Sequence, residues 1–377
     1  LFKFEKRAFF LFNTLRFKEY YSIELPIFAS LIKFKQTMSF ERFAKWTLLS
    51  IFLIIVAGGI VRMTGSGMGC PDWPKCFGLV IPPVHVDQVL WSTDKAFSEG
   101  QMIIHQDQLW FAHTPFVSGK VYDASNWSLY TKHDYVNFNP LHTWVEYVNR
   151  LIGVLAGFLT LGLFFKSFAF WKIKRKIVFL SAFIVFLMGF QGWLGAVVVY
   201  SVLQPIQITI HMLMALFIVA LMVYLISEAP NKKGVSLLSY DKKLYNFIKI
   251  ALFLSILQII LGTQVRQLID EIAKSFDYAQ RELWIESAGN VFKIHRSFAI
   301  SLVLVNGFLF VRNYVFNLGF SYPKYIAVVI LVEVLSGIVL TYFDMMSLMQ
   351  PIHLIVASLL FILQIAFYFE LKKLKTK

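Results

Sequence analysis

Long runs of apolar residues, separated by shorter polar connections, form the main pattern of this chain. Eight of these runs have the length of a membrane-spanning helix, which needs about 20 mostly apolar residues to cross the hydrocarbon core. The pattern predicts spans at residues 43–61, 143–165, 177–200, 205–226, 247–265, 291–311, 325–343 and 348–369. We therefore expect an all-α, polytopic membrane protein with eight transmembrane helices.

The composition agrees with a protein that resides in a lipid bilayer. Hydrophobic residues make up 58% of the chain and charged residues only 15%, whereas a soluble domain carries about 25% charged residues. The net charge of +14 would suit a nucleic-acid partner if it formed one patch. The lysines and arginines instead lie between the apolar runs, as they do in membrane proteins, so we expect no nucleic-acid partner.

Basic and acidic residues alternate between successive connections and so indicate the orientation. Lysine and arginine fill the connections at residues 166–176 and 232–243 and the end of the chain at 372–377, while acidic residues fill the connections between them. Because basic residues favour the cytoplasmic side, both termini are expected in the cytoplasm. The long segment 62–142 is then an outer loop.

Matching residues recur in the two halves of the chain at nearly constant spacing. Asn149 and His295 are 146 residues apart, Gly192 and Gly337 are 145 apart, and His211 and His353 are 142 apart. Two pseudo-symmetric four-helix bundles would produce this repeat. The expected organisation is a cytoplasmic segment 1–42 (or an extension upstream of Met38), a half 43–228, a linker 229–246, a half 247–371 and a basic tail 372–377.

His295 and His353 are the main candidates for chemistry in the second half. Ionisable side chains inside a span are costly and usually functional, and these two lie at matching depth on different helices. Two facing imidazoles would ligate a heme iron, with Arg266 and Arg296 near its propionates. The alternative is that each histidine only bonds neighbouring helices. Zinc is disfavoured because no further ligand of suitable type lies at that depth.

The first half carries a less complete version of the same arrangement. His211 corresponds to His353, but Asn149 stands where the partner histidine would be, and an amide is a poor iron ligand. His142, Glu146 and Asn149 share one helical stripe, which indicates a heme pocket with one strong ligand and a carboxylate. In the alternative reading, Glu146 pairs with Arg150 one helical turn away.

The outer loop contains both cysteines of the protein, Cys70 and Cys76. Outside the cytoplasm a disulfide between them is the expected state. It either staples the loop or forms a redox-active cover over the pocket. The remaining loop is rich in aromatic residues and is expected to cap the membrane surface, and its histidines are interpreted as surface residues: His85, His105, His113 and His133.

Several motifs together resemble the heme A synthase family, in its form with an extended first outer loop that is found in bacteria and mitochondria. They are the segments 58–67 (GGIVRMTGSG), 70–76 (CPDWPKC), 146–150 (EYVNR) and 293–296 (KIHR), and the resemblance covers about residues 40–370. It implies a cofactor heme b on His295 and His353, and a substrate heme o pocket with His211, Glu146, Asn149 and His142. Many family members have histidine where this chain has Asn149.

The resemblance further implies oxidation of a ring methyl of heme o to a formyl group by successive hydroxylations, with Glu146 as the catalytic carboxylate. The product, heme A, serves cytochrome oxidase. Candidates for propionate binding are Arg62, Arg150, Arg266 and Arg296. The expected setting is a bacterial inner membrane, with heme O synthase and an electron donor such as ferredoxin as partners, and a homo-oligomer is allowed. The alternatives are a b-type cytochrome or heme-handling protein without substrate oxidation, and a transporter with structural histidines.

Overall fold

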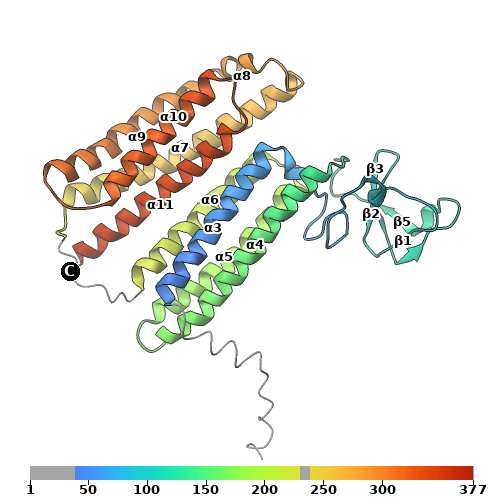
Figure 1. The fold of residues 1–377 in the computed structure, drawn as a ribbon, viewed down its shortest axis with the longest axis horizontal. Coiled ribbons are helices and arrows are strands. Elements are labelled where there is room, and N and C mark those ends of the chain that lie inside the picture. Colours follow the sequence, from blue (N-terminus) through green and yellow to red (C-terminus); the bar gives the residue numbers. More distant parts are fainter. Residues whose placement is uncertain (1–38, 230–237, 377) are drawn as a thin grey trace, which may run out of the picture.

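The computed structural model describes residues 39–229 and 238–376. Within these residues, eight helices are long and apolar enough to cross a membrane, so the predicted polytopic architecture is confirmed. The helices run side by side in two groups of four (Figure 1). Most of the expected N-terminal segment 1–42 and residues 230–237 of the expected linker lie outside the described residues.

The first half is a ring of four helices. They are α3 (Phe40–Met63), α4 (Pro140–Ser167), α5 (Arg175–Tyr200) and α6 (Pro205–Glu228). Each helix contacts the next and α6 returns to α3, so α4 and α6 lie diagonally across the ring. Small and branched apolar side chains from all four helices fill its interior, among them Ala44, Ala156, Ile184 and Met222.

The second half repeats the same order of neighbours. It contains α7 (Lys242–Ser275), α9 (Gly289–Val315), α10 (Tyr322–Tyr342) and α11 (Met349–Lys375), with α11 returning to α7. In its interior the Ser255 hydroxyl donates to Gln364, whose amide donates to Asn306. Because buried polar groups need partners in lipid, this chain of hydrogen bonds fixes the packing of α7, α11 and α9.

The two halves meet along one seam. The helix α11 of the second half packs against both α3 and α6 of the first, and α6 also contacts α7. At the seam Gly59 of α3 leaves room for the Leu354 side chain of α11, which would lie 3.4 Å from a Cβ at that position. The Thr209 hydroxyl donates to that of Thr263 and links α6 to α7.

The outer loop forms a small region with strands, which the sequence did not predict. The pair β1 (Ala96–Phe97) and β4 (Phe116–Val117) is antiparallel, as is the sheet of β2 (Met102–His105), β3 (Gln108–Ala112) and β5 (Trp127–Leu129). Aromatic side chains around Trp127 pack between the sheets. The region projects from one end of the helices, opposite to the C-terminus (Figure 1).

Helix α7 is longer than the apolar run that predicted it. It continues ten residues past Val265, because Val265, Ile269 and Ala273 form an apolar stripe that packs on Trp284 of the short helix α8 (Arg281–Ser287). It also begins inside the expected linker, where the Asp241 side chain caps its first turn by accepting from the backbone N–H of Leu244. The last turn of α11 contains Lys372, Lys373 and Lys375 of the expected tail.

Candidate functional site

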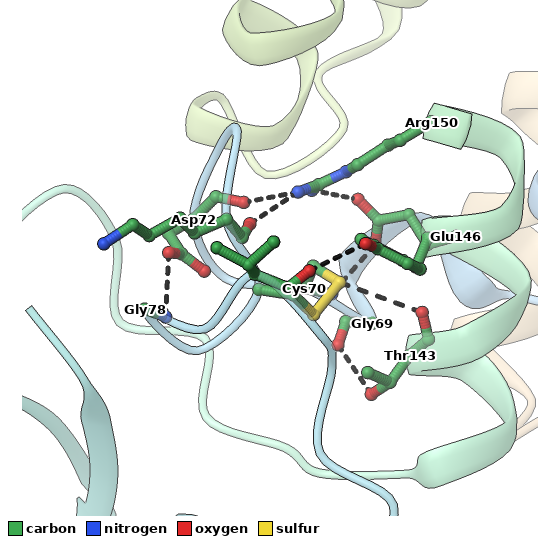
Figure 2. The surroundings of a disulfide bond; sticks show 11 residues. Gly69, Cys70, Asp72, Gly78, Thr143, Glu146 and Arg150 are labelled. Carbon is green, nitrogen blue, oxygen red and sulfur yellow. Dashed lines mark hydrogen bonds and ion pairs between the residues drawn. A yellow bond between two sulfur atoms is a disulfide. The ribbon is translucent and has the colours of Figure 1, made fainter. Parts of the chain in front are cut away.

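Glu146 lies near the outer end of α4 and is almost completely buried. One carboxylate oxygen accepts from the backbone N–H of Cys70 at 2.9 Å, and the other accepts from the Arg150 guanidinium at 2.6 Å (Figure 2). The pairing with Arg150, one turn further along the helix, is therefore present. The carboxylate also binds the outer loop, which the sequence did not indicate.

Arg150 reaches from α4 into the outer loop. Its Nη1 atom donates to the carbonyl oxygens of Asp72 and Lys75, at 2.8 and 2.7 Å, while Nη2 binds Glu146 (Figure 2). These charge-assisted bonds hold the loop against the helix. Arg150 thus uses its terminal nitrogens within the protein and would have to release the loop to bind a propionate.

Cys70 and Cys76 form the predicted disulfide. Both are fully buried in the loop's own apolar core, together with Phe77 and Val89. The Thr143 hydroxyl of α4 donates to the carbonyl of Gly69 at 2.8 Å, next to the disulfide (Figure 2). A Cβ on Gly69 would collide with the backbone carbonyl of His142, so only glycine allows this close approach.

Asp72 stabilises the turn between Cys70 and Gly78, which contains the disulfide. Its carboxylate accepts from the backbone N–H of Gly78 at 2.9 Å (Figure 2). Burial raises the pKa of the Asp72 carboxyl, and the Gly78 N–H and the nearby Arg150 guanidinium oppose that shift. The turn from Cys70 to Gly78 is thus a rigid unit fastened to α4.

His211 and Asn149 face the interior of the first half from diagonal helices. The His211 ring lies 3.6 Å from where a Cβ on Gly195 would be, and the Asn149 amide oxygen lies 4.0 Å from the same position on Gly58. Each has one buried polar atom, His211 Nδ1 and Asn149 Oδ1, without a hydrogen-bond partner among the described residues. These atoms are free to meet a bound molecule.

His295 and His353 occupy the equivalent places in the second half. The His295 ring lies 3.2 Å from a Cβ placed on Gly262, and the His353 ring lies 3.5 Å from one on Gly337. The helices that carry them, α9 and α11, lie diagonally across the second ring of helices. Within the described chain, Nδ1 of His295 is buried and has no partner. Two imidazoles across a bundle, each beside a glycine, fit a flat macrocycle with bis-histidine ligation.

The glycine contacts correct one match between the halves. The repeat in the sequence matches Gly192 with Gly337. In the structure, Gly337 faces the His353 ring, and the glycine that faces the His211 ring is Gly195. Gly195 and Gly337 are 142 residues apart, the same spacing as the two histidines. Gly192 instead faces the ring of Trp73 in the outer loop.

Two residues beside His353 were missed in the sequence. Ser336 of α10 lies 2.8 Å from Nδ1 of His353, and the Glu333 carboxylate lies 3.2 Å from its Nε2. Glu333 is an acidic residue in the middle of an apolar span, and that position alone was a sufficient signal. By the spacing of 142, it stands where Gln191 stands in the first half.

The remaining propionate candidates divide into two groups. Arg62 of α3 and Arg266 of α7 both bind the carboxylate of Asp270, at 3.3 and 2.6 Å, and so link the two halves. Arg266 also donates to Gln350. Arg296 is exposed and lies over the ring of Phe292.

The other predicted histidines do not form a metal site. His142 is half-buried in the first turn of α4, above Glu146. In the outer loop, His133 bonds the carbonyl of Pro71 at 2.8 Å and His105 stacks on Tyr122. Across residues 39–229 and 238–376, no group of His, Cys, Asp or Glu is arranged to hold a metal ion by itself.

Comparison with known sequences agrees with this arrangement. A family described as cytochrome oxidase assembly protein matches residues 41–113 and 128–365, which include every helix that carries a candidate residue. The chain belongs to this family. The gap between the matched segments lies in the outer loop.

Named relatives support the resemblance found in the motifs. The heme A synthase of Shewanella oneidensis is 28% identical over 216 residues, which are 57% of this chain and 53% of the relative. Those of Wolbachia pipientis and Rickettsia prowazekii are 23% and 24% identical over 86% and 87% of this chain, and 91% and 97% of the relatives. The match to the Shewanella oneidensis protein spans about half of that protein's length.

Proposed function

We propose that this protein is a heme A synthase, which oxidises the C8 methyl of heme o to a formyl group by successive hydroxylations. The observation that carries the proposal is that the second half has a pair of imidazoles, whereas the first half has one imidazole and an amide, with the buried Glu146 carboxylate on the helix that carries the amide. The second half has the complete pair, His295 and His353, and the first half has His211, Asn149 and Glu146. One half is thus suited to a permanent cofactor and the other to a substrate.

The cofactor of the second half would be a heme b, held by His295 and His353. When bound, it would supply one-electron transfer. Neighbouring residues support the two histidines. Gly262 and Gly337 give the imidazole rings room, and the side-chain amide of Gln258 donates to the backbone carbonyl of His295 at 3.0 Å. Each hydroxylation removes two electrons from the methyl carbon, so the reaction needs a redox partner outside this chain, and an electron-transfer protein such as ferredoxin is the proposed one.

The substrate heme o would lie in the first half with His211 as its axial ligand. The Glu146 carboxylate near the outer end of that half can stabilise positive charge that develops on the methyl carbon, or hold a water molecule for attack. Such a charge acts strongly in a site that excludes water. Because the Cys70 N–H and Arg150 already position the carboxylate, little reorganisation is needed during the reaction.

The setting follows from the same proposal. We infer a bacterial cytoplasmic membrane, both termini on the cytoplasmic side, and the disulfide region on the outside, with heme O synthase supplying the substrate. Arg62 and Arg266 would interact with propionates through their Nε–H groups, which are buried and have no partner among the described residues.

Pigment extraction from the purified protein tests the function, with Glu146→Ala as the decisive variant. Wild type should contain heme b together with heme o or heme A. Glu146→Ala should keep the b-type absorption spectrum and form no heme A. Purified wild type without heme would favour the transporter alternative, and a Glu146→Ala protein with the normal rate of heme A formation would exclude the catalytic role of this carboxylate.

A further inference from the structure

The surroundings of His353 differ from those of the other two intramembrane histidines. Nδ1 of His211 and of His295 has no hydrogen-bond partner among residues that the structure describes, whereas Nδ1 of His353 lies 2.8 Å from the hydroxyl of Ser336. By the spacing of 142 residues, the first half has Leu194 at the place of Ser336. The contact therefore belongs to the second half alone.

The direction of this hydrogen bond follows from the second contact of the serine. The Ser336 hydroxyl donates to the backbone carbonyl of Glu333, one turn earlier in α10, at 2.8 Å. A hydroxyl has one proton to donate, so in this arrangement its oxygen can accept from an Nδ1–H of His353, the nitrogen that carries the proton when Nε2 binds a metal ion. A neutral ring that carries its proton on Nδ1 has its lone pair on Nε2, which is the form that binds a metal ion.

The position in front of Nε2 is held by Glu333. Its Oε1 lies 3.2 Å from Nε2, where an iron ligand would have to approach, and its other oxygen is buried without a partner in the described chain. This contact holds the ring only while a proton lies between Nε2 and Oε1, and iron bound to Nε2 would take the place of that proton. The Ser336 contact can persist with iron bound to Nε2, while the Glu333 contact cannot.

We propose that Ser336 is a positioning residue that fixes the ring orientation and the tautomer of His353 for axial ligation of heme b. The inference rests on the proposed function, because it assumes that His353 is the ligand. A hydrogen bond to Nδ1–H makes the imidazole a stronger donor to the iron, which stabilises the ferric form. Partners of this kind change metal affinity by about 10- to 100-fold when they are removed.

The experiment compares Ser336→Ala with wild type, both as full-length protein in detergent. The matched control is Ser358→Ala, since Ser358 is also buried in this half but donates only within α11, to Leu354. Ser336→Thr keeps a hydroxyl and should restore the wild-type values. If Ser336→Ala does not fold, Ser336→Gly removes the same hydroxyl.

Three readouts besides activity apply: bound heme b per protein, the midpoint potential of that heme, and the g values of its ferric low-spin signal. Ser336→Ala should lose heme about 10- to 100-fold more readily, raise the midpoint potential and shift the g values, while Ser358→Ala matches wild type. Unchanged values in Ser336→Ala would overturn the role of Ser336. If wild type holds no heme b, or His353→Ala keeps the wild-type spectrum, the ligand assignment itself is wrong.

Discussion

The backbone N–H of Cys70 donates to the Glu146 carboxylate, and this single contact joins the disulfide of the outer loop to the carboxylate inside the first half. On the other side, Arg150 links the same carboxylate to two loop carbonyls. The position of Glu146 therefore depends on a properly folded loop.

Removing the disulfide should disturb Glu146 without removing any of its direct partners. In Cys70→Ser/Cys76→Ser the backbone N–H of residue 70 remains, but the turn loses its cross-link, which is worth about 2 kcal/mol for so short a loop. We expect a lower unfolding temperature and slower heme A formation, with the b-type spectrum retained. Equal rates in the two proteins would show that Glu146 does not need the cross-link.

The close approach of the loop to α4 can be tested with one methyl group. Gly69→Ala should push the loop from the His142 carbonyl and lengthen the Cys70–Glu146 contact, which lowers activity and makes the loop easier to cleave with protease. Gly119→Ala is the control, because a Cβ on Gly119, also in the outer loop, meets no atom within 4 Å. Similar protease sensitivity in both variants would contradict the steric argument.

Substitution of Asp270 should weaken the contact between the two halves. In Asp270→Asn the guanidinium groups of Arg62 and Arg266 lose their common anion and repel each other, at a cost of about 1 kcal/mol for partly exposed groups. Thermal unfolding in detergent should show a lower transition temperature, with the difference reduced in high salt. Glu271→Gln, at the exposed neighbouring position, should unfold like wild type.

The start of α7 and the end of α9 are joined by a pH-dependent contact. Arg312 binds both oxygens of Asp241, at 2.9 and 2.7 Å, and this hydrogen bonding lowers the pKa of the Asp241 carboxyl. A lowered pKa means that the stabilisation is complete above the ordinary Asp range and is lost as the pH falls through the folded-state pKa. Asp241→Asn should therefore lower the free energy of unfolding at neutral pH by about 1 kcal/mol. The resulting fall in unfolding temperature should be much smaller in acid.

The buried polar chain of the second half gives a further stability test. Gln364→Leu leaves Ser255 and Asn306 without their partner in the interior and should cost about 1 kcal/mol. The unfolding temperature of the heme-free protein measures this. A variant as stable as wild type would show that the three side chains find new partners.

The sequence predicted the helices well and their surroundings less well. Apolar runs reveal a span, but α7 continues to Ser275 as a more polar helix with one apolar stripe. A span that ends at residue 265 leaves Asp270 in the following connection, although it lies one helical turn from Arg266. The strands around Trp127 are two to five residues long, too short for a clear alternating pattern. Their hairpin at Gln106 and Asp107 uses two positive φ angles without glycine.

The candidate residues were also predicted unequally. Histidines are rare inside apolar spans, and both cysteines of the chain lie in one loop. The sequence therefore identified His211, His295, His353 and the disulfide directly. The contacts of Glu146 with the Cys70 N–H could not, because a backbone donor 76 positions away leaves no trace in the side-chain pattern. Ser336 was missed for a related reason, since serine is common at helix contacts and only the position of the ring makes it notable.

The packing of α11 has a consequence for how the two centres communicate. The helix that carries His353 touches α6, which carries His211, as well as α3. The helices that carry the two histidines are therefore neighbours across the seam. Under the proposed function, an electron that passes between the halves would cross a single helix-to-helix contact.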